Sequence, residues 1–427
     1  MAVRKRIIVL GAGFAGLEFC KSIKAEDVEI IVIDRRNHHL FQPLLYQVAT
    51  AALSGTDIAQ PIRSILRHVP NLTVYLDEVI DIRLAEKKVL CKHHELTYDY
   101  LVIALGGKTA YFGHDKEWEP FAPGLKSLDD ALNIRQHALT GFEEAENTND
   151  KKLRDELMTI VVIGGGPTGV EMAGAFSELS RVSLPMDFTH IDPRETRIIL
   201  IEAAPRILGH LPEDLSASAL KQLKALHVEV RLNTMVKNIR EGVVELEGEE
   251  IHAHTIVWSA GVAASPLTRK LGVAVDRAGR IEVQPDLSVP GYPEVFAAGD
   301  LVNIKQKSGA LVPGVSPAAM QMGRHIAKVI NAELPGHKLD NAAREAFHYH
   351  DKGTMATIGR SAAVAQIGSI KLHGRIAWLA WLLVHLLFLV GFRNKVSVLF
   401  QWAYNYIRYK RSSRIIFDDF SAKRRSE

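Results

Sequence analysis

Cysteine is scarce in this chain. Cys20 and Cys91 are the only two among 427 residues, and no Cys-x-x-Cys pair occurs. Two isolated cysteines cannot build a disulfide framework, and a dithiol redox centre needs a closely spaced pair. The sequence therefore excludes both a disulfide-stapled scaffold and a dithiol mechanism.

The N-terminal residues and the overall charge give two further expectations. Its N-terminus carries Arg4, Lys5 and Arg6 and then enters an apolar stretch directly, without a small-residue cleavage site, so we expect no secretory signal. The net charge is only +3. Positive charge is concentrated in the tail, because residues 393–427 hold nine Lys/Arg against three Asp/Glu.

What is present is an ordinary globular composition, with 47% hydrophobic and 24% charged residues. A chain of 427 residues is too long for one hydrophobic core. We therefore expect two or three domains.

The N-terminal region contains a Gly-x-Gly-x-x-Gly motif between an apolar strand and the start of a helix. Gly11 permits a tight turn, Gly13 lets the backbone approach a pyrophosphate, and Gly16 lets the helix pack closely. The next apolar strand ends in Asp34, which is placed to accept hydrogen bonds from ribose hydroxyls. This first glycine motif predicts a dinucleotide site.

The pattern recurs in the middle of the chain as a second glycine motif. Gly164, Gly166 and Gly169 follow an apolar strand, and the following strand ends in Glu202. Glu202 comes 33 residues after Gly169, whereas about 20 are usual. We therefore expect a helix extended through roughly Leu184, followed by a loop. Two motifs predict two dinucleotides face to face.

Hydrophobic periodicity predicts the remaining elements. We expect helices at residues 48–52, 55–70, 114–155, 213–226 and 317–332, and strands at residues 72–82, 88–90, 100–107, 228–232, 236–246, 255–261 and 294–300.

Three further segments accompany the glycine motifs: Phe41–Ala49, Leu105–Gly107 and Ala298–Asp300. Together these five pieces resemble type II NADH:quinone oxidoreductases over nearly the whole chain. The glycine motifs and the Gly-Asp strand end belong to a wider flavoprotein superfamily. The Phe41–Ala49 sequence is typical of a much narrower group of proteins. The resemblance implies non-electrogenic entry of electrons into a respiratory chain, from NADH through FAD to a membrane quinone.

The resemblance also implies an α/β fold with two Rossmann-like dinucleotide-binding domains and a C-terminal membrane-anchoring segment. The FAD-binding domain is split between residues 1–115 and 285–345, and the NADH-binding domain, residues 156–275, is inserted. Residues 346–427 form the C-terminal interface and anchoring region. The implied location is peripheral, on the cytoplasmic face of a bacterial-type inner membrane, and a homodimer is allowed.

The glycine motif and the family resemblance each indicate residues that bind the flavin. Gly11, Gly13, Gly16 and Asp34 are assigned by motif, and Gln47, Ala104, Gly106 and Asp300 by family position. Asp34 stands where a longer Glu is common, so its reach to the ribose is in question. Ordinary packing is the alternative for the aromatic, apolar segment around Gln47.

Glu171 lies in the first turn of the second motif's helix. A carboxylate there gains about 0.3–1 kcal/mol from the helix dipole, and this alone could explain it. The resemblance instead implies a position near the flavin and the nicotinamide, where Glu171 could orient the ring or relay a proton.

The family's quinone-side signature, Ala-Gln-x-Ala-x-Gln, corresponds here to Ser316–Gln321. Pro317 stands at a glutamine position and offers neither a side-chain hydrogen bond nor a backbone N–H. Gln321 is retained, and Lys352 matches a family lysine near the quinone. A solvated surface lysine is the alternative for Lys352.

Two other partner classes are not expected. His252 with His254, and His348 with His350, could each present two rings on one face of a strand, but no third and fourth metal ligand follow at a recognised spacing. The basic tail contains no known nucleic-acid-binding module.

Residues 376–390 form an apolar run interrupted only by His385. As a helix this run would be about 22 Å long, shorter than the ~30 Å hydrocarbon core of a bilayer. The following residues mix apolar and aromatic side chains with a basic end, as interfacial helices do. We expect a monotopic anchor over residues 376–416, with a buried core helix or a transmembrane span as alternatives.

Two other functions remain open at this point. The two-motif fold also suits a soluble reductase of a small iron–sulfur protein, although the apolar C-terminal segment argues against it. A non-catalytic nicotinamide sensor at the membrane is the other, and NADH turnover with a short-chain quinone would reject it.

Overall fold

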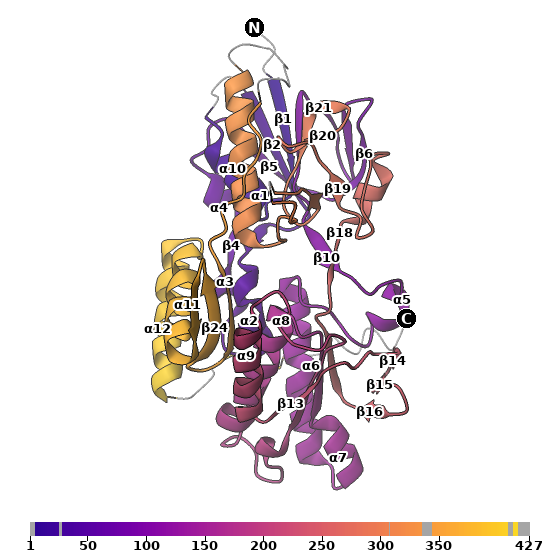
Figure 1. The fold of residues 1–427 in the computed structure, drawn as a ribbon, viewed down its shortest axis with the longest axis vertical. Helices are drawn as coiled ribbons and strands as arrows, with labels where there is room; N and C mark the ends of the chain where they lie inside the picture. The colour runs from indigo at the N-terminus through magenta and orange to yellow at the C-terminus, as the bar shows by residue number, and fades with distance from the viewer. Residues whose placement is uncertain (1–4, 25–27, 307, 335–343, 409–412, 417–427) are drawn as a thin grey trace. The chain divides into compact units, whose positions relative to one another are not determined.

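The computed structural model describes residues 5–24, 28–306, 308–334, 344–408 and 413–416. The chain divides into two compact units (Figure 1). Unit 1 comprises residues 1–40, 59–108 and 262–352, and unit 2 comprises residues 41–58, 109–261 and 353–427.

Unit 1 is built on a six-stranded sheet in the order β20-β21-β9-β1-β2-β5. Its strands are β1 (Lys5–Leu10), β2 (Val28–Asp34), β5 (Leu72–Leu76), β9 (Tyr100–Ile103), β20 (Ser288–Val289) and β21 (Tyr292–Ala297). All neighbours are parallel except β20 and β21. The central strands are apolar along their length because both faces are covered, as in other parallel sheets.

Two helices of unit 1 pack side by side against this sheet, α1 (Phe14–Ser22) and α10 (Ser316–Glu333) (Figure 1). Gly323 allows their close approach, because a Cβ atom there would collide with the backbone of Ala15. The predicted helix at residues 317–332 is confirmed.

Unit 2 contains a four-stranded parallel sheet in the order β13-β12-β11-β17. Its strands are β11 (Thr159–Ile163), β12 (Arg197–Ile201), β13 (Val228–Arg231) and β17 (Thr255–Trp258), and its main helices are α6 (Leu128–Asn147), α8 (Pro167–Glu178) and α9 (Glu213–Ala225). In each unit the strand before the glycine motif lies between the next strand in sequence and a later one. The second motif is therefore a structural repeat of the first.

The C-terminal part of unit 2 is a three-stranded antiparallel sheet covered by a helix (Figure 1, orange to yellow). Its elements are β23 (Thr354–Gly359), β24 (Ala362–Ile367), β25 (Ile370–His373), α11 (Gly374–Phe388) and α12 (Phe392–Arg408). Small buried residues, Ala363, Ala365 and Ala377, let α11 pack closely on β24.

Shorter elements complete the two units. They are β3 (His38–Leu40), α2 (Leu45–Ala49), α3 (Gly55–Ile58), β4 (Ala59–Pro61), α4 (Ile62–Leu66), β6 (Val79–Arg83), β7 (Lys88–Cys91), β8 (Glu95–Thr97), β10 (Gly107–Thr109), α5 (Asp115–Trp118), α7 (Lys151–Leu157), β14 (Asn238–Arg240), β15 (Val243–Glu245), β16 (Glu250–His252), β18 (Val262–Ala264), β19 (Ile281–Glu282) and β22 (Val302–Asn303).

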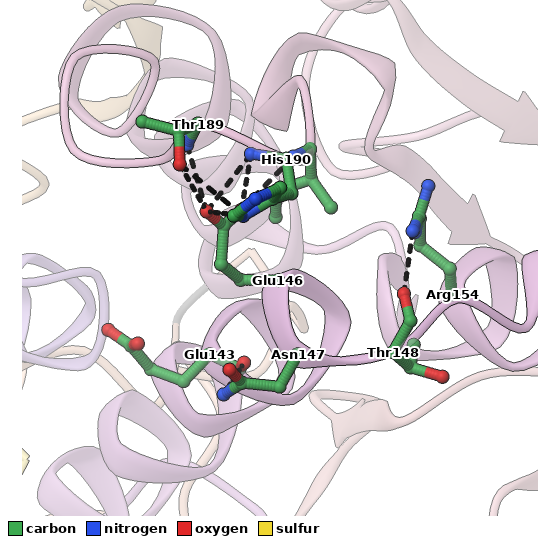
Figure 2. A network of polar contacts seen from close by, with 8 residues as sticks. Glu143, Glu146, Asn147, Thr148, Arg154, Thr189 and His190 are labelled. Atoms are coloured by element: carbon green, nitrogen blue, oxygen red, sulfur yellow. Dashed lines mark hydrogen bonds and ion pairs between the residues drawn. The ribbon is translucent and has the colours of Figure 1, made fainter.

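The long connection between the second glycine motif and Glu202 is ordered by one carboxylate (Figure 2). After α8, a π-helical turn spans Leu179–Ser183, so the predicted extension to about Leu184 is confirmed. Glu146 of α6 then accepts hydrogen bonds from the backbone N–H groups of Thr189, His190 and Ile191. The extra residues are thus a loop held against α6.

Several predicted boundaries are wrong. The predicted helix at residues 55–70 is α3, β4 and α4, because Pro61 cannot donate a helical hydrogen bond. The helix predicted at residues 48–52 is α2, which begins at Leu45 after a 3-10 turn. Both errors lie around proline, where local chain geometry overrides hydrophobic spacing.

Three longer predictions also divide. The strand predicted at residues 72–82 is β5 and β6, and that at residues 236–246 is the hairpin of β14 and β15, with Gly242 at φ +68° in its turn. The helical region at residues 114–155 is three helices. Ser127 and Asp150 begin the second and third by accepting backbone N–H bonds.

The expected histidine pairs do not share strands. His252 ends β16 and His254 lies beyond it, where its ring stacks on that of His137 with centroids 4.0 Å apart. Across the described ranges, no group of three or more His, Cys, Asp or Glu residues is arranged to hold a metal ion.

Candidate functional site

The three glycines of the first motif differ in their surroundings. Gly11 has φ +96°, and a Cβ atom there would collide with the carbonyl of Ala104. A Cβ atom at Gly16 would collide with the carbonyl of Gly11. A Cβ atom at Gly13 would meet no protein atom within 4 Å. The first and third glycines therefore serve packing, whereas Gly13 borders open space suited to a pyrophosphate.

Asp34 reaches the first motif in spite of its short side chain. Its carboxylate accepts hydrogen bonds from the backbone N–H groups of Ala12 at 2.7 Å and Arg36 at 2.8 Å. The charge is thus fixed at the carboxyl end of β2, beside the glycine turn.

The second glycine motif has the same geometry. Gly164 has φ +108°, a Cβ atom at Gly169 would collide with the carbonyl of Gly164, and Gly166 borders space without protein atoms within 4 Å. Glu202 accepts from the backbone N–H groups of Gly165 at 2.6 Å and Ala204 at 2.7 Å. Gly13 and Gly166 are the N-caps of α1 and α8, and neither provides a side-chain cap, so these helix ends suit an anion.

Ala104, Gly106 and Asp300 lie at the carboxyl edge of the unit 1 sheet, together with Gly11 and Asp34. Ala104 and Gly106 follow β9, and Asp300 follows β21, which pairs with β9 in parallel. Ala104 donates its N–H to the carbonyl of Leu10 at 2.8 Å. Ligands of open α/β sheets bind at this edge, so these residues fit a dinucleotide. Gln47 belongs to unit 2 instead.

Unit 2 contains a pocket that includes both Gln47 and Glu171. Its walls come from α2, α8, the turn between β23 and β24, α11 and α12. The lining residues are Tyr46, Gln47, Thr50, Ala52, Glu171, Ala175, Glu178, Val182, Ser183, Leu226, Thr357, Gly359, Arg360, Trp378, Trp381 and Trp402. Three tryptophans and two carboxylates therefore face the same space.

Glu171 is the most perturbed carboxyl in this pocket. Burial disfavours its charged form and raises its pKa to about 8. Hydrogen bonding from the Thr357 backbone and proximity to the Trp381 indole oppose that increase. The indole Nε1 itself is buried and forms no hydrogen bond of standard geometry within the described structure. The raised pKa favours the protonated form of Glu171 near neutral pH. Glu171 is the fifth residue of α8, beyond its first turn, so the predicted helix-end position is wrong.

An aromatic cluster surrounds the buried end of the pocket. Trp381 stacks on His385 with centroids 4.1 Å apart and lies 5.9 Å from Trp402. The Trp402 indole donates to Gln47 Oε1 at 2.9 Å, and Gln47 Nε2 donates to the Tyr46 hydroxyl at 2.9 Å. The segment around Gln47 therefore both packs against the C-terminal helices and lines a pocket.

Asp57 holds α12 in place. Its carboxylate accepts from Ser397 Oγ at 2.8 Å and from Gln401 Nε2 at 2.9 Å, and it is buried. Trp402 follows directly, so these bonds position its indole over Gln47.

Sequence reasoning did not identify Trp381, Trp402, Thr357 or Asp57. Both tryptophans lie in the apolar C-terminal segment, whose composition predicts membrane contact and does not distinguish a buried face from an exposed one. Nothing in the local sequence distinguishes Asp57 or Thr357 from surface residues.

Gln321 and Lys352 belong to unit 1 and not to the pocket lining. The Gln321 amide donates to the His350 carbonyl at 3.0 Å and accepts from the His350 N–H at 2.9 Å. Gln321 thereby fixes the backbone two residues before Lys352, whose side chain is exposed.

Comparison with known proteins supports this organisation. The profile of the pyridine nucleotide-disulphide oxidoreductase family matches residues 5–323, and that of the NDH2 C-terminal domain matches residues 351–409. The type II NADH:quinone oxidoreductase Ndh of Mycobacterium tuberculosis is 43% identical over 428 residues, covering 97% of this chain and 91% of the relative. NdhA of the same organism is 44% identical over 427 residues, covering 97% and 89%.

A solved structure of NDH2 from Plasmodium falciparum in complex with NADH has the same fold. Its TM-score is 0.87 at 21% identity, and the alignment covers 97% of this chain and 100% of that one. The two profiles together with the extent and identity of the relatives show the family: this chain belongs to the type II NADH:quinone oxidoreductases, within the pyridine nucleotide-disulphide oxidoreductases.

Proposed function

We propose that this protein oxidises NADH and reduces a membrane quinone by two electrons, with FAD as its resident cofactor and without pumping protons. The observation that carries this proposal is the duplicated dinucleotide geometry, with an open second glycine and an anchored acid in each unit. Bound FAD supplies the redox chemistry, accepting a hydride equivalent from NADH and passing two electrons to the quinone. The residues of the chain bind and orient FAD, NADH and the quinone, and they supply protons.

FAD is assigned to the first glycine motif. Gly13 and the N-terminus of α1 receive the pyrophosphate, and Asp34 accepts from a ribose hydroxyl. Ala104, Gly106 and Asp300 border the same sheet edge, and Gln47 is assigned to the flavin by family position alone. The match of Asp34 to Glu202 in hydrogen bonding supports its role despite the shorter side chain.

NADH is assigned to the second motif, with Gly164, Gly166 and Gly169 at the pyrophosphate and Glu202 at the ribose. A 2′-phosphate would be repelled by the Glu202 carboxylate. Arg206 is the nearby base, but its guanidinium donates to the Gly209 carbonyl at 3.2 Å. NADH should therefore be strongly preferred over NADPH.

The quinone head is assigned to the pocket lined by Glu171 and Gln47. Glu171 is protonated near neutral pH and can donate a proton to a quinone oxygen, because its pKa is raised to about 8 by burial. In unit 1, Lys352 is proposed as a quinone-side residue by family position, and Gln321 holds the backbone near it through His350. Pro317 offers nothing equivalent to the family glutamine.

We propose that α11 and α12 lie on the cytoplasmic face of a bacterial inner membrane as a peripheral, monotopic anchor. On α11, Ile376, Leu379, Leu383 and Leu387 are 67%, 59%, 59% and 61% exposed. Leu399, Phe400 and Tyr404 continue this apolar exposure on α12. Within the described ranges, the helices are all too short or too polar to span a bilayer. A homodimer formed through the same face is the alternative.

An anaerobic spectrum of the purified protein tests the whole proposal. NADH should bleach a bound flavin and a short-chain quinone should restore its colour. Restoration of the colour by an iron–sulfur protein but not by quinone would reject it, as would a protein that binds NADH without bleaching.

A further inference from the structure

Quinone reduction creates a need for one external proton in each turnover. NADH gives up a hydride, which is two electrons and one proton, whereas a quinol holds two electrons and two protons. The balanced reaction is NADH + H⁺ + quinone → NAD⁺ + quinol. We propose that Glu178 is a proton-relay residue that takes this proton from solvent at the open end of the pocket and passes it to Glu171 at the buried end. This inference rests on the proposed function.

The two carboxylates lie on one face of one helix. Glu171 and Glu178 are both on α8 and are seven residues apart, which is two helical turns and about 10 Å along the axis. Both line the same pocket. Ala175 lies between them on that face and also lines the pocket, and its side chain is only a methyl group. The helix surface therefore leaves a passage from one to the other.

The pocket has a buried end beside Glu171 and an open end beside Glu178, and the two glutamates themselves are both half-buried. Gln47, Thr50, Thr357, Trp381 and Trp402 form a buried end. At the other end Val182 is 43% exposed, and Glu178, Arg360 and Trp378 are half-buried. Solvent thus reaches the pocket beside Glu178. A chain of water molecules can link the two carboxyls, because ordered waters pass hydrogen bonds from one polar group to the next.

Charged groups near Glu178 come from the pocket lining and from two neighbouring segments. Glu171, Glu178 and Arg360 are the charged residues of the pocket lining, and the Arg360 backbone N–H donates to Glu178 Oε1. Arg181, on the adjoining π-helical turn, directs its guanidinium to Ser180 Oγ and the Thr196 carbonyl instead. Arg414 bonds the Ser183 carbonyl. The Arg360 backbone thus ties Glu178 to the turn between β23 and β24.

The relay gives Glu171 a way to recover its proton. Burial raises the pKa of Glu171 to about 8, so it holds a proton before quinone reduction. After donating it, the Glu171 carboxylate, which lies near the Trp381 indole, must be reprotonated from outside. A titratable group at the pocket mouth shortens that path.

The decisive variant is Glu178→Gln. Its amide oxygen can still accept from the Arg360 N–H, so the turn between β23 and β24 is preserved, but it cannot carry a proton. Stopped-flow reduction of the flavin by NADH should be unchanged. Reoxidation by a short-chain quinone should slow at least tenfold at pH 8, with a larger solvent deuterium isotope effect. Small weak acids such as acetate should restore part of the rate, and Glu178→Asp should retain most of it.

A direct readout follows the proton itself. The infrared band of protonated Glu171, assigned with Glu171→Gln, should recover more slowly after a pH jump in Glu178→Gln than in the unaltered protein. Glu144→Gln is the matched control, because Glu144 is exposed on α6 of the same unit and outside the pocket lining.

Three results would overturn the relay: wild-type rates and pH profile in Glu178→Gln, equal losses in both half-reactions, or an increase only in KM for the quinone. Wild-type rates would show that Glu178 is dispensable. Equal losses in both half-reactions would make it a structural residue, and an increase only in KM would make it part of the quinone entrance. Failure of the unaltered protein to reduce quinone would instead reject the proposed function.

Discussion

Gly13 and Gly16 stand three residues apart, yet a side chain at each would meet different surroundings. Gly13 has φ −70°, which any residue adopts, and its Cβ position is open, whereas Gly16 touches the backbone of Gly11. We predict that Gly13→Leu folds but loses FAD, because the new side chain fills the pyrophosphate space. Flavin absorbance and thermal unfolding of the purified variant test this.

Gly166→Leu is the matched control for Gly13→Leu. It should retain FAD and lose NADH binding, since its own Cβ position is equally open. Full flavin occupancy in Gly13→Leu would show that the first motif does not hold the pyrophosphate.

Glu171 predicts a pH limit on the quinone half-reaction. Its pKa is raised to about 8 by burial, so the proton that it donates is present below pH 8 and lost above it. The rate of flavin reoxidation by quinone should therefore fall as pH rises through 8. Glu171→Gln should be slow and lack this transition. A transition of unchanged position in that variant would assign it to another group.

The glycines of the two motifs were predictable because the backbone geometry at these positions requires glycine. A turn at φ +96° beside a neighbouring strand needs glycine, so Gly11 is visible in any sequence. Trp402 and Asp57 were not predictable, because their partners, Gln47 and Ser397, are more than 300 residues away along the chain. Long-range pairs of this kind leave no local pattern.

Two histidines connect α6 with the start of β17, because each ring bonds the backbone carbonyl of the other residue. His137 Nε2 donates to the His254 carbonyl at 2.7 Å, and His254 Nε2 donates to the His137 carbonyl at 3.1 Å. Burial, followed by repulsion from His137, lowers the pKa of His254 to about 4, although its hydrogen bond opposes this.

This pair predicts loss of stability in acid. Because the pKa is lower when folded, the unfolded chain binds more protons between about pH 6.5 and 4, and the free energy of unfolding falls as pH decreases through that window. The contribution of His254 is about 2 kcal/mol at pH 4 after allowance for partial exposure. Urea unfolding from pH 7 to 4 measures it. His254→Phe keeps the stacking and should have a flatter profile; an equally steep one would exclude His254 as the cause.

The loop held by Glu146 predicts a local effect (Figure 2). Burial opposes ionisation of Glu146, but hydrogen bonds from Thr189 and His190 outweigh it and lower the pKa to about 2. Glu146→Ala should accelerate amide exchange at Thr189, His190 and Ile191 while β11 and β12 remain protected. Glu143→Ala, on the same helix, is the control. Unchanged exchange in Glu146→Ala would mean that other contacts hold the loop.

Elements were predicted well where periodicity and end signals agree, as for α9 and α10. Prediction failed where chain-breaking residues interrupt an amphipathic pattern. Pro61 divides one expected helix, and Ser127 and Asp150 begin new helices inside another. Hydrophobic spacing continues through such breaks, so it cannot locate them.

For the whole molecule, the repeated motif predicts two similar sheets, and both are present. The sequence does not show that residues 41–58 belong to the unit containing the second motif. That placement depends on contacts with α11 and α12, such as Asp57 with Gln401, which only the folded chain brings together. It also changes the best test of membrane binding. A chain ending after Gly374 would lose both the anchor and the buried wall of the pocket.

Substitutions on the outer face of α11 separate these two effects. Leu379, Leu383 and Leu387 are exposed, whereas Trp381 on the same helix is buried. We predict that replacing the three leucines with Glu abolishes flotation with anionic lipid vesicles, because each leucine contributes about 1.5–3 kcal/mol when fully buried. NADH oxidation with a short-chain quinone should persist, since the pocket lining is untouched, but turnover of a long-chain quinone in vesicles should fall.

Leu153→Glu supplies the control for these substitutions, because Leu153 is 44% exposed on α7 of the same unit and is not part of α11 or α12. It should float with vesicles as the unaltered protein does. If the triple variant remains with the vesicles, the anchor lies elsewhere. If it leaves a dimeric state while still binding vesicles, the apolar face of α11 joins two copies of the chain. A monotopic anchor requires that vesicle binding and long-chain quinone turnover be lost together, because a quinone confined to the bilayer reaches the pocket only when these helices lie on it.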